Sequence, residues 1–212
     1  MAEPVISLRL TAKRFRGVAV LGPIALDIGP GEALAVTGPS GVGKTTLLRI
    51  LAGLDTDFDG TLTRPDRTAM VFQEPTLLPW RDLVANIRLP TGAGSAEVEA
   101  LLAEVGLAGR GTAFPGQLSL GQQRRLSLAR ALAARPELLL MDEPFVSLDP
   151  ARVEEMIELT ERLLHARDTA SVIVTHARAE AERLAERILV LDRTPARVVE
   201  EIRVRTGRGP RS

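Results

Sequence analysis

Gly38-Pro39-Ser40-Gly41-Val42-Gly43-Lys44-Thr45 is the stretch of this sequence that decides the fold. Glycine, four residues, glycine, lysine and a hydroxyl residue form the pattern of a phosphate-binding loop. The glycines let successive backbone N–H groups wrap phosphate oxygens, and the helix that begins there points its positive end at them. The Thr45 hydroxyl is the expected ligand for Mg²⁺. The stretch therefore predicts a phosphate and Mg²⁺ site between a strand and a helix.

Lys44 stands out because the chain has only two lysines, Lys13 and Lys44, against 25 arginines. A flexible ammonium follows the β- and γ-phosphates as a point charge, which the rigid fork of arginine does not do. The alternative is a glycine-rich turn without a ligand. A strand pattern directly before the loop favours the phosphate site.

The segments around the loop predict an α/β fold: a P-loop core with a largely parallel sheet and an N-terminal antiparallel portion. The apolar runs 138–141 and 172–174 fit strands buried on both faces of a parallel sheet. Strands are expected over 5–10, 24–28, 33–37, 69–72, 138–141, 171–175 and 188–191. Helices are expected over 44–51, 96–105, 122–134, 151–166 and 178–185. Ser95 is expected to cap the helix that Gly106 ends.

Residues 1–212 are read as a single domain. Between Gln73 and Gly121 the strand signals vanish and prolines recur, which predicts a small helical subdomain over about 74–133. Residues 205–212 are expected to form a disordered tail.

A second acidic element follows a predicted buried strand at Asp142-Glu143. In a P-loop site, Asp142 would hold the metal and Glu143 would orient or deprotonate the attacking water. The alternative reading is that Asp142-Glu143-Pro144 only ends a strand in a turn.

Further motifs occur in a fixed order around this pair: Gln73 after a strand, Leu118-Ser119-Leu120-Gly121-Gln122 before a helix, Ser147-Leu148-Asp149, and Thr175-His176. In this order the chain resembles the nucleotide-binding subunits of ATP-binding cassette (ABC) transporters, from about residue 5 to residue 204. The resemblance implies an ATPase that uses ATP and Mg²⁺ and works as a dimer, most simply a homodimer, on transmembrane permease subunits.

The resemblance also implies a role for each matching residue. Glu143, His176 and Gln73 would be catalytic, with Gln73 also touching Mg²⁺ beside Thr45 and Asp142. Phe15 would stack on adenine, Ser119 and Gly121 would meet the γ-phosphate held by the opposite subunit, and Asp149 would link the two sites. The whole implied nucleotide-binding set comprises Phe15, Gly38, Pro39, Ser40, Gly41, Val42, Gly43, Lys44, Thr45, Thr46, Ser119, Gly121, Gln122 and Asp149.

Three of these residues have a structural alternative. Phe15 is read otherwise as a core residue, since phenylalanine is so often buried. Asp149 before Pro150 is a good helix N-cap whatever else it does. His176 alone would more often be a surface histidine at a helix start.

Leu120 departs from the family pattern, which has glycine at this position. Glycine permits close approach of the backbone to phosphate, and a leucine Cβ could crowd it. Ser119 and Gly121 are intact, so activity is expected, at a reduced level if the leucine does not point away.

Residues 71–80, with Phe72-Gln73-Glu74-Pro75 and Leu78-Pro79-Trp80, are similar to importers of the nitrate, sulfonate and taurine group, as are residues 190–199. Residues 73–80 are expected to face the permease, with Trp80 as an anchor. The alternative is that Trp80 packs inside the helical subdomain.

Other functional classes fit less well. A GTPase would need an asparagine-lysine guanine motif, but the only asparagine is Asn86, followed by isoleucine. A chromosome-maintenance ATPase would need long heptads, and only 45 residues separate Gln73 from Ser119. A ribosome-acting protein would normally carry two cassettes. An exporter subunit remains the alternative to an importer subunit.

Composition limits the partners. The formal net charge is +0, without the basic excess of a nucleic-acid binder, and the chain has no cysteine for a disulfide or thiolate metal site. No apolar run reaches the ~18 residues of a membrane span. The chain is expected at the cytoplasmic face of the cell membrane, held there by a permease and served indirectly by a solute-binding protein.

Overall fold

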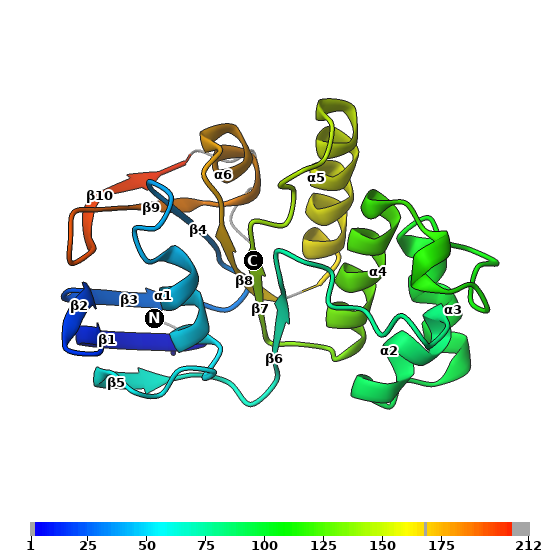
Figure 1. The fold of residues 1–212 in the computed structure, drawn as a ribbon, viewed down its shortest axis with the longest axis horizontal. Helices are drawn as coiled ribbons and strands as arrows, with labels where there is room; N and C mark the ends of the chain where they lie inside the picture. Colours follow the sequence, from blue (N-terminus) through cyan, green and yellow to red (C-terminus); the bar gives the residue numbers. More distant parts are fainter. Residues whose placement is uncertain (1–2, 168, 205–212) are drawn as a thin grey trace.

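The computed structural model describes residues 3–167 and 169–204, and its centre is a six-stranded sheet (Figure 1). The strand order is β10-β9-β4-β8-β7-β6, in which β10 is antiparallel to β9 and the other neighbours are parallel. The strands are β4 (Ala33–Thr37), β6 (Thr68–Val71), β7 (Leu138–Asp142), β8 (Ala170–Val174), β9 (Arg187–Asp192) and β10 (Arg197–Arg203). Every residue of β7 and β8 is buried, as their continuous apolar runs predict.

A second, antiparallel sheet holds the N-terminal part of the chain. Strand β1 (Ile6–Phe15) pairs with β2 (Val18–Leu21), β3 (Ile24–Ile28) and β5 (Asp59–Thr63). Ile6, Leu8 and Leu10 of β1 are buried at every second position, and β3 alternates in the same way. This alternation gives the sheet one apolar face toward the core. The predicted fold class, with its parallel core and antiparallel N-terminal portion, is confirmed.

The helices cover the two faces of the six-stranded sheet. Alternate residues of β7 point to opposite cores: Leu138 and Leu140 pack with the antiparallel sheet and α1, whereas Leu139 and Met141 pack with α2, α3, α4 and α5. Figure 1 shows the antiparallel sheet and α4 on opposite sides of β7. The helices are α1 (Lys44–Leu51), α2 (Leu83–Thr91), α3 (Ser95–Glu104), α4 (Leu120–Ala133), α5 (Pro150–His165) and α6 (Arg178–Leu184).

Residues 74–133 form α2, α3, a 3₁₀ turn at Pro115–Gln117 and α4, without a strand in this described stretch. Whether they constitute a separate subdomain stays a prediction. Trp80, before α2, is 69% exposed, so the alternative that it packs inside this helical region is wrong.

Several local expectations are corrected. The strand expected over 5–10 continues to Phe15, and β2, β5, β10 and α2 were not predicted. Ser95 does not cap its helix: it is the first helical residue, and the N-cap is Gly94, which has no side chain to bond an N–H. Gly106 does end that helix, with φ 73°. The tail expected over 205–212 lies outside the described residues.

Among the described residues, no helix is both long and apolar enough to cross a bilayer.

Candidate functional site

The phosphate-binding loop lies between β4 and α1, and its glycines are needed sterically. A Cβ on Gly38 would lie 2.2 Å from the carbonyl oxygen of Leu191, and one on Gly43 would lie 2.6 Å from Leu21 Cδ2. Gly43 is the N-cap of α1 at φ 115° and has no side chain to bond the first amides of the helix. Those amides are therefore open to an anion.

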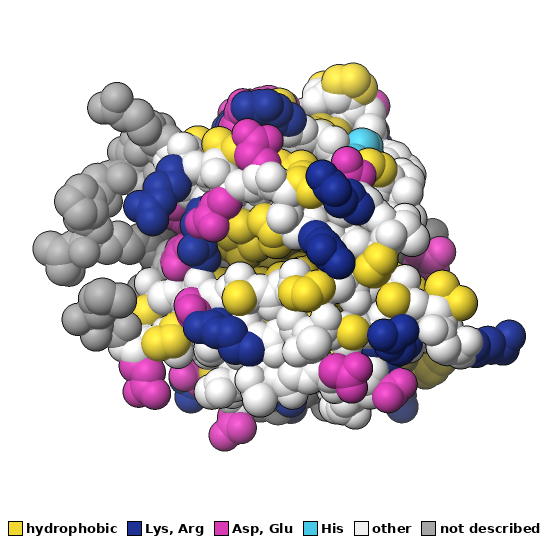
Figure 2. Space-filling model, turned by 90° about the vertical axis from the view of Figure 1, so that its left-hand side faces the viewer, with side chains coloured by type: hydrophobic (Ala, Val, Ile, Leu, Met, Phe, Trp, Pro, Cys, Tyr) yellow, Lys and Arg dark blue, Asp and Glu magenta, His cyan; other side chains and the backbone are white. Residues whose placement is uncertain are grey.

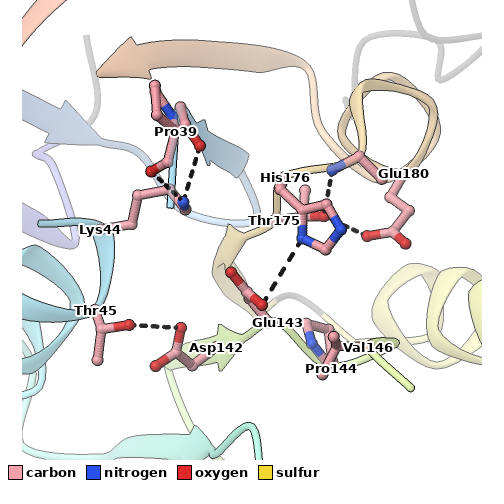
Figure 3. Close-up of polar contacts among 12 residues, drawn as sticks. Pro39, Lys44, Thr45, Asp142, Glu143, Pro144, Val146, Thr175, His176 and Glu180 are labelled. Atoms are coloured by element: carbon pink, nitrogen blue, oxygen red, sulfur yellow. Dashed lines mark hydrogen bonds and ion pairs between the residues drawn. The ribbon is translucent and has the colours of Figure 1, made fainter. Parts of the chain in front are cut away.

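The Lys44 ammonium is held by its own loop. Its Nζ donates hydrogen bonds to the carbonyl oxygens of Gly38 at 2.9 Å and Pro39 at 3.0 Å (Figure 3). The side chain is buried, so its charge sits among backbone dipoles rather than in bulk water. A phosphate oxygen would be a stronger acceptor for this ammonium than either carbonyl, because it is ionised.

Thr45 and Asp142 meet although 97 residues separate them, with Thr45 Oγ1 donating to Asp142 Oδ1 at 3.2 Å. Asp142 ends β7 and is buried. Burial raises the pKa of the Asp142 carboxyl, the nearby charge of Glu143 raises it further, and the hydrogen bond from Thr45 opposes both effects. A carboxylate in this situation is stabilised by an added cation.

Glu143 follows at φ 43°, in the left-handed region, where its amide donates to the carbonyl of Val174 at 2.9 Å. This backbone turn separates the two carboxylates. His176, just after β8, has its Nδ1 3.8 Å from Glu143 Oε2, and Figure 3 shows the two side chains facing each other. The pair is ionic only when the imidazole is protonated.

The segment that carries His176 is held by Thr175 and Glu180. The Thr175 hydroxyl donates to the Glu180 carboxylate and accepts from the amide of Ala177 at 3.0 Å. Burial raises the pKa of Glu180, while the Thr175 hydrogen bond and the neighbouring His176 lower it. Sequence reasoning did not find Glu180.

Six of the nine predicted phosphate-loop residues border a cavity of about 310 Å³, together with Gln73 and Glu143. It is lined by Val20, Ser40, Gly41, Gly43, Lys44, Thr45, Thr46, Gln73 and Glu143. His176 lines a neighbouring cavity of about 520 Å³ that reaches Gly38, Pro39 and Ser40 from the other side of the loop. Ser40 borders both cavities, which therefore meet at the loop.

The residues at the start of α4 lie elsewhere. Ser119 is the N-cap: its side chain accepts from the amide of Gln122 at 3.4 Å, and Gln122 Oε1 accepts from the amide of Ser119 at 3.1 Å. Ser119, Gly121 and Gln122 line a separate cavity of about 230 Å³ with Gly106, Arg125, Arg152, Glu155 and Met156. Among the residues that the structure describes, none lines both this cavity and the phosphate-loop cavity.

Phe15 and Asp149 line none of these three cavities. Phe15 is 49% exposed, with Lys13 Nζ 4.6 Å from its ring centroid, so the alternative that it is a core residue is wrong. Its partner strand β2 contributes Val20 to the phosphate-loop cavity. Asp149 is the N-cap of α5, accepting from the amide of Arg152 at 3.1 Å, and its expected capping role is confirmed.

Sequence reasoning also missed three residues of α4 that hold the loops of the site. Arg124 donates to carbonyls of the segment after Glu143, and Ser127 and Arg130 donate to carbonyls of the segment after Gln73. No sequence signal marks these positions, because a serine and two arginines are ordinary residues of a helix.

The sequence profile of the family described as "ABC transporter" matches residues 21–146. The aliphatic sulfonates import ATP-binding protein SsuB of Granulibacter bethesdensis is 47% identical over 194 residues, covering 89% of this chain and 80% of that protein. A second such protein, SsuB 2 of Rhizobium johnstonii, is 45% identical over 207 residues, covering 96% of this chain and 82% of that protein.

A solved structure gives the same result for the fold. The dimeric, post-hydrolysis state of the ATP-binding cassette MJ0796, bound to ADP and Pi, superposes with a TM-score of 0.83 at 29% identity. The match covers 94% of this chain and 99% of that one. The chain therefore belongs to the ABC transporter family, as one of its ATP-binding and ATP-hydrolysing subunits.

Proposed function

We propose that two copies of this chain bind and hydrolyse two molecules of Mg-ATP to drive the import of aliphatic sulfonates. The observation that carries the ATPase part is the cavity that joins the phosphate loop, Gln73 and Glu143, with Asp142 bonded to Thr45 beneath it. The importer part is supported by relatives at 45–47% identity that are named for aliphatic sulfonate import.

Nucleotide binding is assigned to the loop 38–46. On binding, Lys44 Nζ would exchange its bonds to the carbonyls of Gly38 and Pro39 for bonds to the β- and γ-phosphates. The open amides at the start of α1 would supply further donors. The exposed ring of Phe15, at the end of β1, would stack on adenine.

The residues present fit a Mg²⁺ ion. Thr45 Oγ1 and Asp142 Oδ1 are hard oxygen donors already in contact, and Gln73 at the same cavity adds an amide oxygen. The described residues contain no group of three acidic, histidine or cysteine side chains that could hold a metal by themselves. Mg²⁺ in nucleotide sites typically takes one or two carboxylates and completes its shell with phosphates and water. The ion would neutralise phosphate charge in this position.

Glu143 is assigned as the base. Its carboxylate would accept a proton from a water whose oxygen attacks the γ-phosphorus, while the bond from that phosphorus to the bridging oxygen of ADP breaks. The products are ADP and inorganic phosphate. Gln73 would orient the same water, and His176 would contact a γ-phosphate oxygen from the adjoining cavity.

The separation of the two elements proposed to face phosphate supports a second copy. Ser119, Gly121 and Gln122 border a cavity apart from the phosphate loop, so they would reach only a nucleotide held by the opposite subunit. Asp149 would lie between the two sites. The first helical residue of α4, Leu120, is 39% exposed and would face the same nucleotide.

Transmembrane permease subunits are the proposed partners, docked on residues 73–80. Trp80 offers an exposed apolar ring, and prolines 75 and 79 restrict the backbone. The chain would thus lie at the cytoplasmic face of the cell membrane, and a solute-binding protein would deliver the sulfonate outside. Figure 2 shows basic and acidic side chains interspersed on one face of the molecule.

Growth on a sulfonate tests the importer assignment against an exporter. A strain lacking the gene should grow on sulfate but fail on ethanesulfonate as sole sulfur source, and the wild-type gene should restore growth. The Glu143→Gln gene should not restore it. The deletion strain must carry no second sulfonate importer. If it then grows normally on alkanesulfonates, the assignment as a sulfonate importer is rejected, while the ATPase assignment stays intact.

A further inference from the structure

Arg124 is a buried arginine whose hydrogen bonds, within the described part of the chain, all go to backbone carbonyls. Its side chain is on α4, 5% exposed, and its guanidinium donates to the carbonyl oxygens of Pro144 at 2.7 Å and Val146 at 2.5 Å, with a longer bond of 3.4 Å to that of Glu143. These acceptors lie 19 to 22 residues away in sequence. One arginine thus ties α4 to the segment that begins with the proposed base.

Burial of the Arg124 charge is energetically unfavourable. Burial lowers the pKa of Arg124, and its Nε is buried without a hydrogen-bond partner among residues 3–167 and 169–204. A buried charge is ordinarily compensated by an opposite charge. Here the compensation comes from carbonyl dipoles, which are aligned only while residues 143–146 keep their present conformation.

That conformation is strained at both ends of the segment. Glu143 has φ 43° and Ser147 has φ 63°, both in the left-handed region that non-glycine residues rarely adopt. Strain of this kind persists only where the surroundings impose it. The three carbonyl bonds to Arg124 start at Glu143 and end just before Ser147, so they are among the contacts that hold this stretch.

Helix α4 also contacts other parts of the proposed site. Its N-cap, Ser119, lines the separate cavity that is proposed to meet the opposite subunit's nucleotide. Farther along, Ser127 Oγ donates to the Pro75 carbonyl at 2.7 Å and Arg130 donates to the Thr76 carbonyl at 2.9 Å, behind Gln73. α4 is therefore bonded to the segments of both Glu143 and Gln73.

We propose that Arg124 is a positioning residue that holds the Glu143 carboxylate where it can accept a proton from the attacking water and links it to the start of α4. This inference rests on the proposed ATPase mechanism, in which Glu143 is the base. Arg124 touches neither nucleotide nor metal in it. Its effect on hydrolysis passes through the backbone of Glu143.

Steady-state kinetics of purified Arg124→Gln and Arg124→Lys test this proposal, with Arg167→Gln as the matched control. Arg167 also donates to a backbone carbonyl, that of Leu163, but it pairs with Glu104 away from the site. A small displacement of a catalytic group can lower the reaction rate by up to about 100-fold. We therefore expect Arg124→Gln to lower kcat about 10- to 100-fold. KM for ATP should change less than about twofold, since the phosphate loop is untouched. Arg124→Lys, which keeps the charge and one or two bonds, should be intermediate.

Adding Arg124→Gln to Glu143→Gln separates positioning from a merely structural role. If Arg124 acts through Glu143, the second change should lower the residual rate no further, because the two act as a unit. An equal loss in both backgrounds, or wild-type kcat in a folded Arg124→Gln protein, overturns the proposal. If Arg124→Gln does not fold, wild-type kcat in Arg124→Lys overturns it equally. Failure of the mechanism itself is seen separately, as an absence of Mg²⁺-dependent hydrolysis in the wild type.

Discussion

Thr45 and Asp142 are joined by a 3.2 Å hydrogen bond between the first turn of α1 and the last residue of β7, across a sheet edge where two parts of the chain converge. The bond orients one oxygen of the Asp142 carboxylate. Because burial dominates its environment, the pKa of Asp142 is raised in the nucleotide-free protein. A cation at this position would favour the ionised carboxylate.

Asp142→Asn should stabilise the nucleotide-free protein. The folded-state pKa is above the unfolded value of about 3.9, so the folded state binds more protons in that window and stability falls as pH rises through it. The amide removes this loss at neutral pH. We expect a higher melting temperature, by about 2–4 °C for each kcal/mol gained, and a smaller further rise with Mg-ATP than in the wild type. Thermal unfolding at pH 7 measures both.

The control for this experiment is Asp66→Asn, since Asp66 is exposed. It should leave the melting temperature and the response to Mg-ATP as in the wild type. A lower melting temperature for the nucleotide-free Asp142→Asn protein would contradict the role assigned to burial.

Glu143→Gln should trap the ATP-bound dimer. Glutamine keeps the size of the side chain but accepts no proton from water, so kcat should fall by about 100-fold or more while ATP still binds. Light scattering with ATP and Mg²⁺ should show the doubled mass. Lys44→Ala should lose ATP binding and remain monomeric under the same conditions. Wild-type turnover by Glu143→Gln would reject Glu143 as the base.

Leu120→Gly should raise turnover or tighten the ATP-bound dimer. Leu120 is partly exposed at the start of α4, where its side chain would stand between the backbone and the opposite nucleotide. Removal of the Cβ permits closer approach, at a cost of about 0.5–1 kcal/mol in helix stability. ATPase rates and the ATP dependence of dimerisation measure the effect. Unchanged values for both would show that the leucine points away from the phosphate.

The buried elements were predictable from the sequence because their pattern has a direct physical cause. β7 and β8 are buried on both faces and therefore appear as continuous apolar runs. β5 and β10 are mostly exposed and polar, so their residues carry no such pattern. Pairing with β1 and β9 makes them strands. The pairing with β1 also explains the glycine at position 60 of β5, since a Cβ there would lie 2.2 Å from the Arg9 carbonyl oxygen.

Helix α2 was not predicted because of a proline within it. Pro90 argues against a helix, but it lies in the last turn of α2, after an Asp82 cap whose side chain accepts from the Ala85 amide at 2.7 Å. For the site, the motifs identified Lys44, Asp142 and Glu143 individually. Arg124 could not be recognised among 25 arginines, since only the tertiary fold decides which arginine is buried against residues 143–146.

Trp80→Ala should weaken co-purification of the permease while leaving soluble ATPase activity largely intact. The ring is 69% exposed, so its removal costs little core packing, and large exposed aromatics are frequent anchors at interfaces. Leu78 is half-buried, and its amide and carbonyl are both bonded to the Asn86 side chain, which fixes the backbone two residues before Trp80. The Leu78→Ala/Trp80→Ala double variant should therefore bind still more weakly.

Leu54→Ala, which removes a leucine that is 62% exposed after α1, is the control and should bind as the wild type does. Retention of the permease by the double variant at wild-type yield would reject residues 73–80 as the docking segment, whereas loss of binding with kcat intact assigns it.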